Sequence, residues 1–297
     1  MTKTTLERSH PLDHLVLPTA DLAVARARLT ALGFTVAPRG VHPFGTDNCC
    51  VYFSDGTFVE PLAIDDAVTA AKAIAAGNTF VARDKAYRGH LGEEGFSAIV
   101  FGTDDADADH ARYVEAGISA GNRLDFSRPF VDAAGNSDTA SFRLAFAAAV
   151  DAPESFLFSC ERVNAPNVDR TSLQAHANGV GGMIEIVAVS SNPSAQYDLL
   201  RTAANVNGGD FVGEGILTLA NASITLLDAA AFEKRFGVSS GAPSRLSFAA
   251  VVFSVADLAS LRKLLAANGI GLHLRGDSVV VLPAPGQGAV FVFKETA

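Results

Sequence analysis

The chain repeats one pattern of apolar and polar positions four times. Each copy has a short apolar strand, a polar or acidic turn and an amphipathic helix that ends near Gly or Asn. The clearest copies begin at Leu15 and Val251, and weaker copies begin at Ile99 and Val187. A strand–helix unit that recurs along a chain indicates a fold built from repeated modules. We therefore expect an α+β fold, in which four βαβββ modules pair into two half-open mixed β-sheet barrels with helices outside.

The first copy shows how the unit is derived. The alternating segment Leu12–Leu17 predicts a strand, and Asp21 predicts the N-cap of a helix that continues to Ala31. Downstream, Cys49–Phe53 and Thr57–Ile64 flank a Ser-Asp-Gly turn, which is typical of a β-hairpin. This order of elements gives β-α-β-β-β.

The same pattern divides the chain into two halves. The modules cover about residues 12–64, 95–163, 181–228 and 245–295. The polar segment Asn164–Asn178 indicates a connector between the second and third modules. We expect an N-terminal paired-module domain at residues 1–165 and a C-terminal paired-module domain at residues 166–297, the latter with a degenerate site.

Composition and charge narrow the classes of partner. The chain has 297 residues, of which 48% are hydrophobic, and its formal net charge is -9. Nucleic acids and anionic membranes bind basic surfaces, so we expect neither as a partner. No apolar run predicts a membrane helix or a secretory signal, and three cysteines without a CxxC motif indicate reduced thiols. We expect a cytoplasmic protein with a small-molecule substrate or ligand, either a monomer or a homodimer.

His14 and Glu60 are the first candidates for chemistry. His14 alternates with Leu15 on the first strand, and Glu60 shares a strand face with Phe58. Because the opposite face of each strand is apolar and suits helix packing, we expect both polar side chains to face the cavity. An imidazole and a carboxylate suit a divalent metal or a general-base pair; the alternative is a buried structural hydrogen bond.

Glu161 is the candidate for a third metal ligand and for a second catalytic carboxylate beside Glu60. In the second module Ala98 matches His14 and cannot bind a metal, whereas Glu161 lies near the position that matches Glu60. Three protein ligands with open positions are typical of a catalytic metal site. The alternative for Glu161 is a salt bridge at the end of a strand. In the C-terminal half, Glu185 and Ala250 match His14, so we expect the chemistry in the N-terminal half.

A second group of residues is expected to bind substrate. A turn-forming loop carries two of them, the HANG segment carries another, and two arginines suit a carboxylate or phosphate through forked hydrogen bonds. The alternatives are a scaffold role for the loop and the HANG segment, and solvated surface charge for the arginines. These expected substrate-binding residues are His42, Asn48, Arg128, Arg162 and His176. No phosphate loop, dinucleotide fingerprint or serine nucleophile elbow is present in the sequence.

Several segments resemble the glyoxalase-like branch of the vicinal oxygen chelate superfamily. They are LDHLVLPTADLAVARARLTALGF, HPFGTDN, FVEPLAI and the later HANG. The resemblance implies paired βαβββ modules around a cupped site. It also implies a divalent metal (Zn, Ni, Mn or Fe) held by His14 and Glu60, with Glu161 from the second module. Ala98 departs from this pattern and leaves open a protein without metal.

Three functions follow from this resemblance. The first is a metal-dependent lyase or isomerase that stabilises an enolate of a small oxygenated metabolite. The second is a non-catalytic, resistance-type binding protein, which Ala98 and the 20 Phe of the chain favour because they suit an aromatic pocket. The third is an extradiol-type dioxygenase; its iron site uses two His and one carboxylate, which here requires His42 to join.

Overall fold

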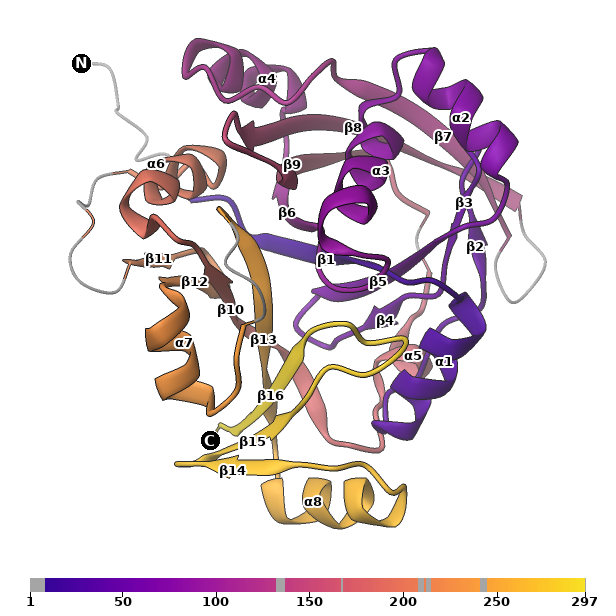
Figure 1. The fold of residues 1–297 in the computed structure, drawn as a ribbon. Coiled ribbons are helices and arrows are strands. Elements are labelled where there is room, and N and C mark those ends of the chain that lie inside the picture. Colours follow the sequence, from indigo (N-terminus) through magenta and orange to yellow (C-terminus); the bar gives the residue numbers. More distant parts are fainter. Residues whose placement is uncertain are drawn as a thin grey trace, which may run out of the picture.

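The computed structural model describes residues 9–131, 137–166, 168–207, 211, 215–240 and 245–296. Their strands form two mixed sheets (Figure 1). The first sheet has the order β2 (Gly40–Val41), β3 (Thr46–Asn48), β5 (Phe58–Ile64), β1 (Leu12–Pro18), β6 (Ala98–Thr103), β9 (Ala152–Asn164), β8 (Ser137–Ala149) and β7 (Leu124–Val131), and β4 (Val51–Tyr52) pairs with β5. The second has the order β11 (Gly215–Thr218), β12 (Ser223–Leu227), β10 (Val180–Val189), β13 (Ser247–Val255), β16 (Val290–Glu295), β15 (Ser278–Val281) and β14 (His273–Arg275).

Each module contributes one helix directly after its first strand. These helices are α1 (Leu22–Ala31), α4 (Ala106–Glu115), α6 (Pro193–Ala203) and α8 (Leu258–Ala267). Their N-caps are Asp21, Asp105, Asn192 and Asp257, and each cap side chain accepts hydrogen bonds from backbone N–H groups of the first turn. The predicted α+β fold of four paired modules is confirmed, whereas the domain boundary at residue 165 stays a prediction.

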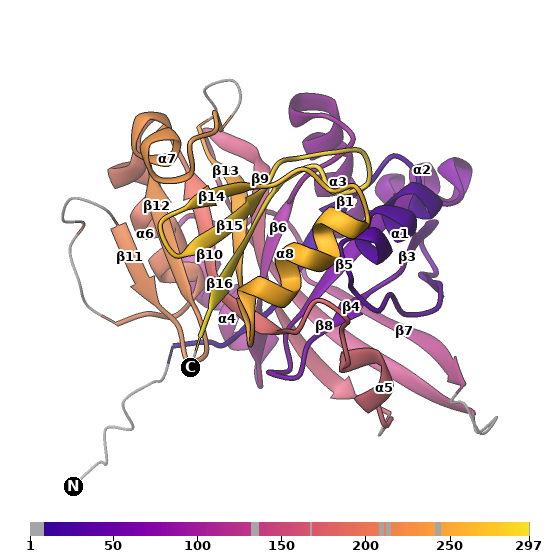
Figure 2. The same ribbon diagram turned by 90° about the horizontal axis from the view of Figure 1, so that it is seen from below.

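The two sheets share one hydrophobic core. It combines one face of the first sheet, with Leu15 and Leu17 of β1, and one face of the second, with Ile186 of β10 and Phe253 of β13. The module helices meet across this core, because the Asn268 amide after α8 donates to the carbonyl of Ala31 at the end of α1, at 2.8 Å (Figures 1 and 2). The remaining face of each sheet therefore points away from the other half.

Further helices pack on those remaining faces. In the N-terminal half α3 (Thr79–Leu91), which follows α2 (Ala67–Ala75), places Phe80 against Phe158. In the C-terminal half α7 (Ala229–Phe236) places Phe232 and Phe236 in one apolar cluster with Val187, Val252 and Val292. The short helix α5 (Thr171–Gln174) lies within the predicted connector.

Strand β1 departs from simple alternation at its start. Its antiparallel register with β6 shifts between Leu12 and His14, and Leu12 belongs to the shared core together with Leu15. Leu12 and His14 therefore lie on opposite faces although they are two residues apart, because an irregularity in the ladder moves side chains to the other face. Among the described helices, none has the length and apolar character needed to cross a membrane.

Candidate functional site

A cavity of about 930 Å³ opens on the free face of the first sheet. Aromatic side chains from both modules and from α3 make most of its apolar wall, among them Phe58, Phe80, Phe126 and Phe158. Cavities of this size and character suit small organic ligands. The structure places six of the predicted site residues in its lining, namely His14, His42, Asn48, Glu60, Arg128 and Arg162.

His14 and Glu60 meet because β1 and β5 run parallel. Val16 pairs with Glu60 and His14 pairs with Phe58 in this register, and the His14 ring stacks on Phe58 at 4.2 Å. His14 Nε2 lies 3.4 Å from Glu60 Oε2, and His14 Nδ1 lies 2.7 Å from Asp13 Oδ1. The imidazole is thus held between two carboxylates.

Arg162 completes this charged cluster. Its guanidinium donates to both carboxylate oxygens of Asp13, with Nη2–Oδ1 at 2.8 Å. Arg162 therefore supports the side chain that orients His14. Sequence reasoning missed Asp13, although a carboxylate next to a histidine in an otherwise apolar strand was the available signal.

Contacts within the cluster favour the charged forms of its members. Burial alone would lower the pKa of His14, but the hydrogen bonds and charges of Asp13 and Glu60 outweigh it and raise that pKa. Burial would raise the pKa of Glu60, but its contacts with His14, His42 and Asn48 lower it to about 2. The pKa of Asp13 likewise falls to about 2 because of His14 and Arg162. These contacts favour the protonated form of His14 between the two carboxylates.

His42 lies beside this cluster in the turn between β2 and β3. Its Nδ1 is 2.9 Å from Thr46 Oγ1, and its Nε2 is 3.7 Å from Glu60 Oε1. Asn48 donates to Glu60 Oε1 at 2.7 Å and faces His42 Nε2 at 3.5 Å. Burial lowers the pKa of His42 to about 4, so this second imidazole is neutral.

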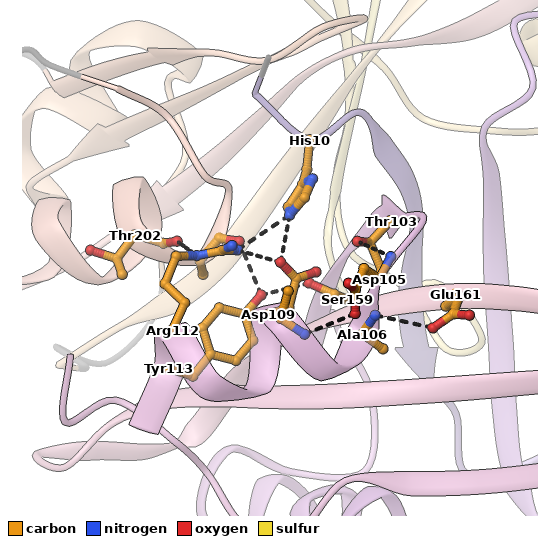
Figure 3. A network of polar contacts seen from close by, with 12 residues as sticks. His10, Thr103, Asp105, Ala106, Asp109, Arg112, Tyr113, Ser159, Glu161 and Thr202 are labelled. Atoms are coloured by element: carbon orange, nitrogen blue, oxygen red, sulfur yellow. Dashed lines mark hydrogen bonds and ion pairs between the residues drawn. The ribbon is translucent and has the colours of Figure 1, made fainter. Parts of the chain in front are cut away.

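Glu161 does not join His14 and Glu60. Its carboxylate accepts a hydrogen bond from the backbone N–H of Ala106 at 3.1 Å, at the start of α4 (Figure 3). Ser159, on the same strand face, is 2.6 Å from the Tyr113 hydroxyl of that helix. Glu161 therefore does not line the cavity, because this face of β9 packs on the helix while Phe158, Cys160 and Arg162 face the cavity. Its role as catalytic residue and metal ligand stays a prediction that this placement does not support.

The sheet register shows which residue does match Glu60. Val16 pairs with Glu60 across β1 and β5, and the corresponding Val100 pairs with Phe158 across β6 and β9. The second module thus places Ala98 and Phe158 where the first places His14 and Glu60. Neither side chain can bind a metal.

These residues do not fit a catalytic metal centre. His14 and Glu60 supply two donors, whereas such centres use three protein ligands. His42, the next imidazole, is held by Thr46 and Asn48. Over the described ranges no group of three His, Cys, Asp or Glu residues is arranged to hold a metal ion.

His176 lies outside the cavity wall. The backbone N–H of Thr35 donates to its Nδ1 at 3.0 Å, and its Nε2 donates to the carbonyl of Tyr52 at 2.9 Å. Its ring also contacts Phe34 and Phe53 in the shared core. Both ring nitrogens tie the segment between the halves to the first module, so the substrate-binding role stays a prediction that this placement does not support.

Other side chains of the cavity were not predicted. Cys50, Cys160 and Tyr52 line it, and Arg170 stacks over the Tyr52 ring at 4.7 Å. All three cysteines are free, as expected. Burial raises the pKa of both cavity cysteines, so they are thiols rather than nucleophilic thiolates.

The C-terminal half keeps a remnant of the same arrangement. Glu185 stands at the His14 position and Thr225 at the Glu60 position, and their side chains are 2.6 Å apart. Arg235 of α7 forms a bidentate ion pair with Glu185. Because α7 packs on this face, we place the site in the N-terminal half.

Comparison with known proteins agrees with this architecture. The glyoxalase-like domain family matches residues 12–203. A hypothetical protein from Staphylococcus aureus has a similar structure, with a TM-score of 0.65, 13% identity, and 96% of this chain and 99% of that chain covered.

Two further structures share the fold. A mutant of 4-hydroxymandelate synthase from Streptomyces coelicolor has a TM-score of 0.58 at 11% identity, covering 97% of this chain and 93% of that chain. The Mn(II)-bound glyoxalase from Novosphingobium aromaticivorans has a TM-score of 0.51 at 14% identity, covering 97% and 82%. No curated protein sequence matches. The family match covers most of the chain, and the chain therefore belongs to the glyoxalase-like domain family.

Proposed function

We propose that this protein binds a small organic molecule in the cavity of its N-terminal half. The observation that carries the proposal is the cavity of about 930 Å³ with an aromatic wall and a buried polar cluster around His14 and Glu60. Aromatic walls supply most of the binding energy for a small apolar body, and a few fixed polar groups orient it. The cluster is already ordered by its own hydrogen bonds, so the ligand meets a preorganised site.

Ligand-dependent thermal stabilisation tests this proposal. We expect a panel of monocyclic aromatic compounds to contain ligands that raise the melting temperature, because binding to the folded state alone stabilises it. Ala140→Phe fills part of the cavity and should abolish that rise, since Ala140 is buried in the lining. Thr139→Phe adds the same side chain at an exposed neighbour on β8 and should leave binding unchanged. The proposal would be contradicted if ligands stabilised both variants equally. It would also be contradicted if no compound of the panel stabilised the wild-type protein.

A second candidate is an isomerase or lyase that acts on the bound molecule. The contact between His14 Nε2 and Glu60, with Asp13 behind Nδ1, favours it because one acid and one base lie side by side. Glu60 would take a proton from the carbon next to a carbonyl, which requires the ligand to loosen the contacts that lower the pKa of Glu60, and His14 would donate a hydrogen bond to the enolate oxygen that forms. Exchange of that hydrogen with deuterated solvent, followed by NMR, tests this reaction. Exchange that persists in His14→Gln would refute this division of roles between His14 and Glu60.

Metal-dependent versions of this chemistry are not part of the proposal. Both the metal-dependent lyase and the extradiol-type dioxygenase need three protein ligands and exchangeable positions around a metal. The second module places Ala98 and Phe158 where two of those ligands would stand. The similarity to a Mn(II)-bound glyoxalase concerns the fold alone.

A further inference from the structure

Arg128 is the charge in the cavity wall that the His14 cluster does not use. Arg162 pairs with Asp13, and Arg39 pairs with Asp47. Arg128, half-buried on β7, forms no ion pair with any carboxylate in the described part of the chain. A guanidinium that is partly removed from water without an anion leaves forked donors ready for one.

Gly40 makes the room for this guanidinium. A Cβ at position 40 would lie 2.8 Å from Arg128 Nη1 and 2.5 Å from Asn48 Oδ1. The absence of a side chain on β2 therefore lets Arg128 approach Asn48, whose amide holds Glu60. This approach places the guanidinium beside the polar cluster rather than at the rim.

An aromatic surface lies beside Arg128 on the same strand. Phe126 stands two residues before it, on the same face of β7, which separates the two side chains by roughly 7 Å. The Phe126 ring stacks on Phe142 at 5.0 Å and contacts Phe44 at 5.2 Å. A ligand with a flat apolar ring and an anionic group at that separation would place the ring on these phenylalanines and the anionic group on Arg128.

The other charged side chains of the cavity also favour an anionic ligand. Glu60 is satisfied by His14 and Asn48, and Asp169 at the opening accepts from the backbone and hydroxyl of Thr171. Arg170, next to Asp169, is exposed and stacks on Tyr52. A ligand entering the cavity thus meets an excess of guanidinium groups over available carboxylates.

We propose that the ligand class of this cavity is small monocyclic aromatic carboxylic acids, with the carboxylate on Arg128 and the ring on the Phe126–Phe142 surface. This inference rests on the proposed binding function and specifies in addition that the ligand is an anion. A forked guanidinium–carboxylate pair adds directional hydrogen bonds to the charge attraction. Neutral analogues of the same shape keep only the ring contacts.

Binding measurements with matched acid and amide probes test this assignment. Phenylacetate and phenylacetamide, and benzoate and benzamide, are titrated into the full-length protein by calorimetry at pH 7.5. We expect each acid to bind roughly 10- to 100-fold more tightly than its amide, because a hydrogen bond to a charged group carries that much discrimination. Equal affinity for acid and amide overturns the inference and leaves the proposed binding function standing. Absence of binding by all four probes overturns the inference as well.

Variants separate the charge from the shape of the site. Arg128→Gln should lower the affinity for the acids to that for the amides and leave the amides unchanged. Arg143→Gln is the matched control, because Arg143 lies on β8 and pairs with Glu161, away from the cavity. Gly40→Ala should weaken acid binding by displacing Arg128 and Asn48. Acid binding that is unchanged in Arg128→Gln, or equally lost in Arg143→Gln, refutes the role of Arg128.

Discussion

Replacing Glu60 by Gln probes the charged cluster directly. The new side chain keeps the shape of Glu60 but carries no charge. In the wild-type protein Glu60 Oε2 lies 3.4 Å from His14 Nε2. The pKa of Glu60 falls from 4.5 to about 2 in the folded protein. A shift of that size corresponds to about 3 kcal/mol of stability at neutral pH. Removing one partner of a buried ion pair costs a similar amount, on the order of 3–5 kcal/mol.

The pH dependence distinguishes this effect from a general loss of packing. A carboxylate with a lowered folded-state pKa stabilises the protein above its unfolded value of 4.5, and this contribution is lost as pH falls towards 2. His14 acts in the opposite direction, because its raised pKa stabilises the fold below 6.5 and the contribution is lost as pH rises through the folded value. Glu60→Gln should therefore differ most from wild type near neutral pH and least near pH 3.

Urea unfolding followed by circular dichroism measures both effects. We expect Glu60→Gln to lose about 3 kcal/mol at pH 7 and clearly less at pH 3. Replacing His14 and Glu60 together by Leu should cost less than the single change, since no lone charge of the pair stays buried. Glu161→Gln is the contrast and should lose about 1 kcal/mol or less, as its carboxylate holds one backbone N–H. A loss below about 1 kcal/mol for Glu60→Gln at pH 7, or a loss independent of pH, would refute the ion cluster.

Three further predictions concern the scaffold and the metal. Tyr113→Phe removes the hydroxyl that contacts Ser159 and donates to the carbonyl of Ala203, and urea unfolding should show a loss of about 1–2 kcal/mol. His176→Ala should lower stability by about 2–3 kcal/mol, because the Tyr52 carbonyl and the Thr35 N–H lose their partner, yet calorimetry should show unchanged ligand affinity. Treatment with a chelator should leave the melting temperature and ligand binding unchanged; one tightly held divalent ion per chain by elemental analysis would contradict a site with only His14 and Glu60 as donors.

Local sequence pattern was sufficient to predict the modules and to place His14 and Glu60 in the site. The cap Asp21 and the hairpin between β4 and β5 stand where propensity and alternation predicted them. His14 and Glu60 both line the cavity, because each lies on a strand whose opposite face is continuously apolar. These features depend on neighbours along the chain, which the sequence displays.

The register between strands that are distant in the sequence decided where Glu161 and the partners of Asp13 lie. Glu161 and Ser159 share a face, as alternation predicts, but only the pairing of Val100 with Phe158 shows that this face meets α4. Asp13 lies next to His14 in the sequence, but only the pairing of β9 with β6 brings Arg162 to its carboxylate. A slip in register moves a whole set of side chains to the other face of a sheet.

The sequence by itself determined a repeated α+β unit, its helix starts and one histidine–glutamate pair on a cavity face. Only the tertiary structure decided that the N-terminal half keeps its hollow while Phe232 and Phe236 fill the other, and that Gly40 admits Arg128 beside Asn48. The physical reason is range: caps and alternation follow from adjacent residues, whereas cavities and charge clusters arise where segments far apart in the chain pack together.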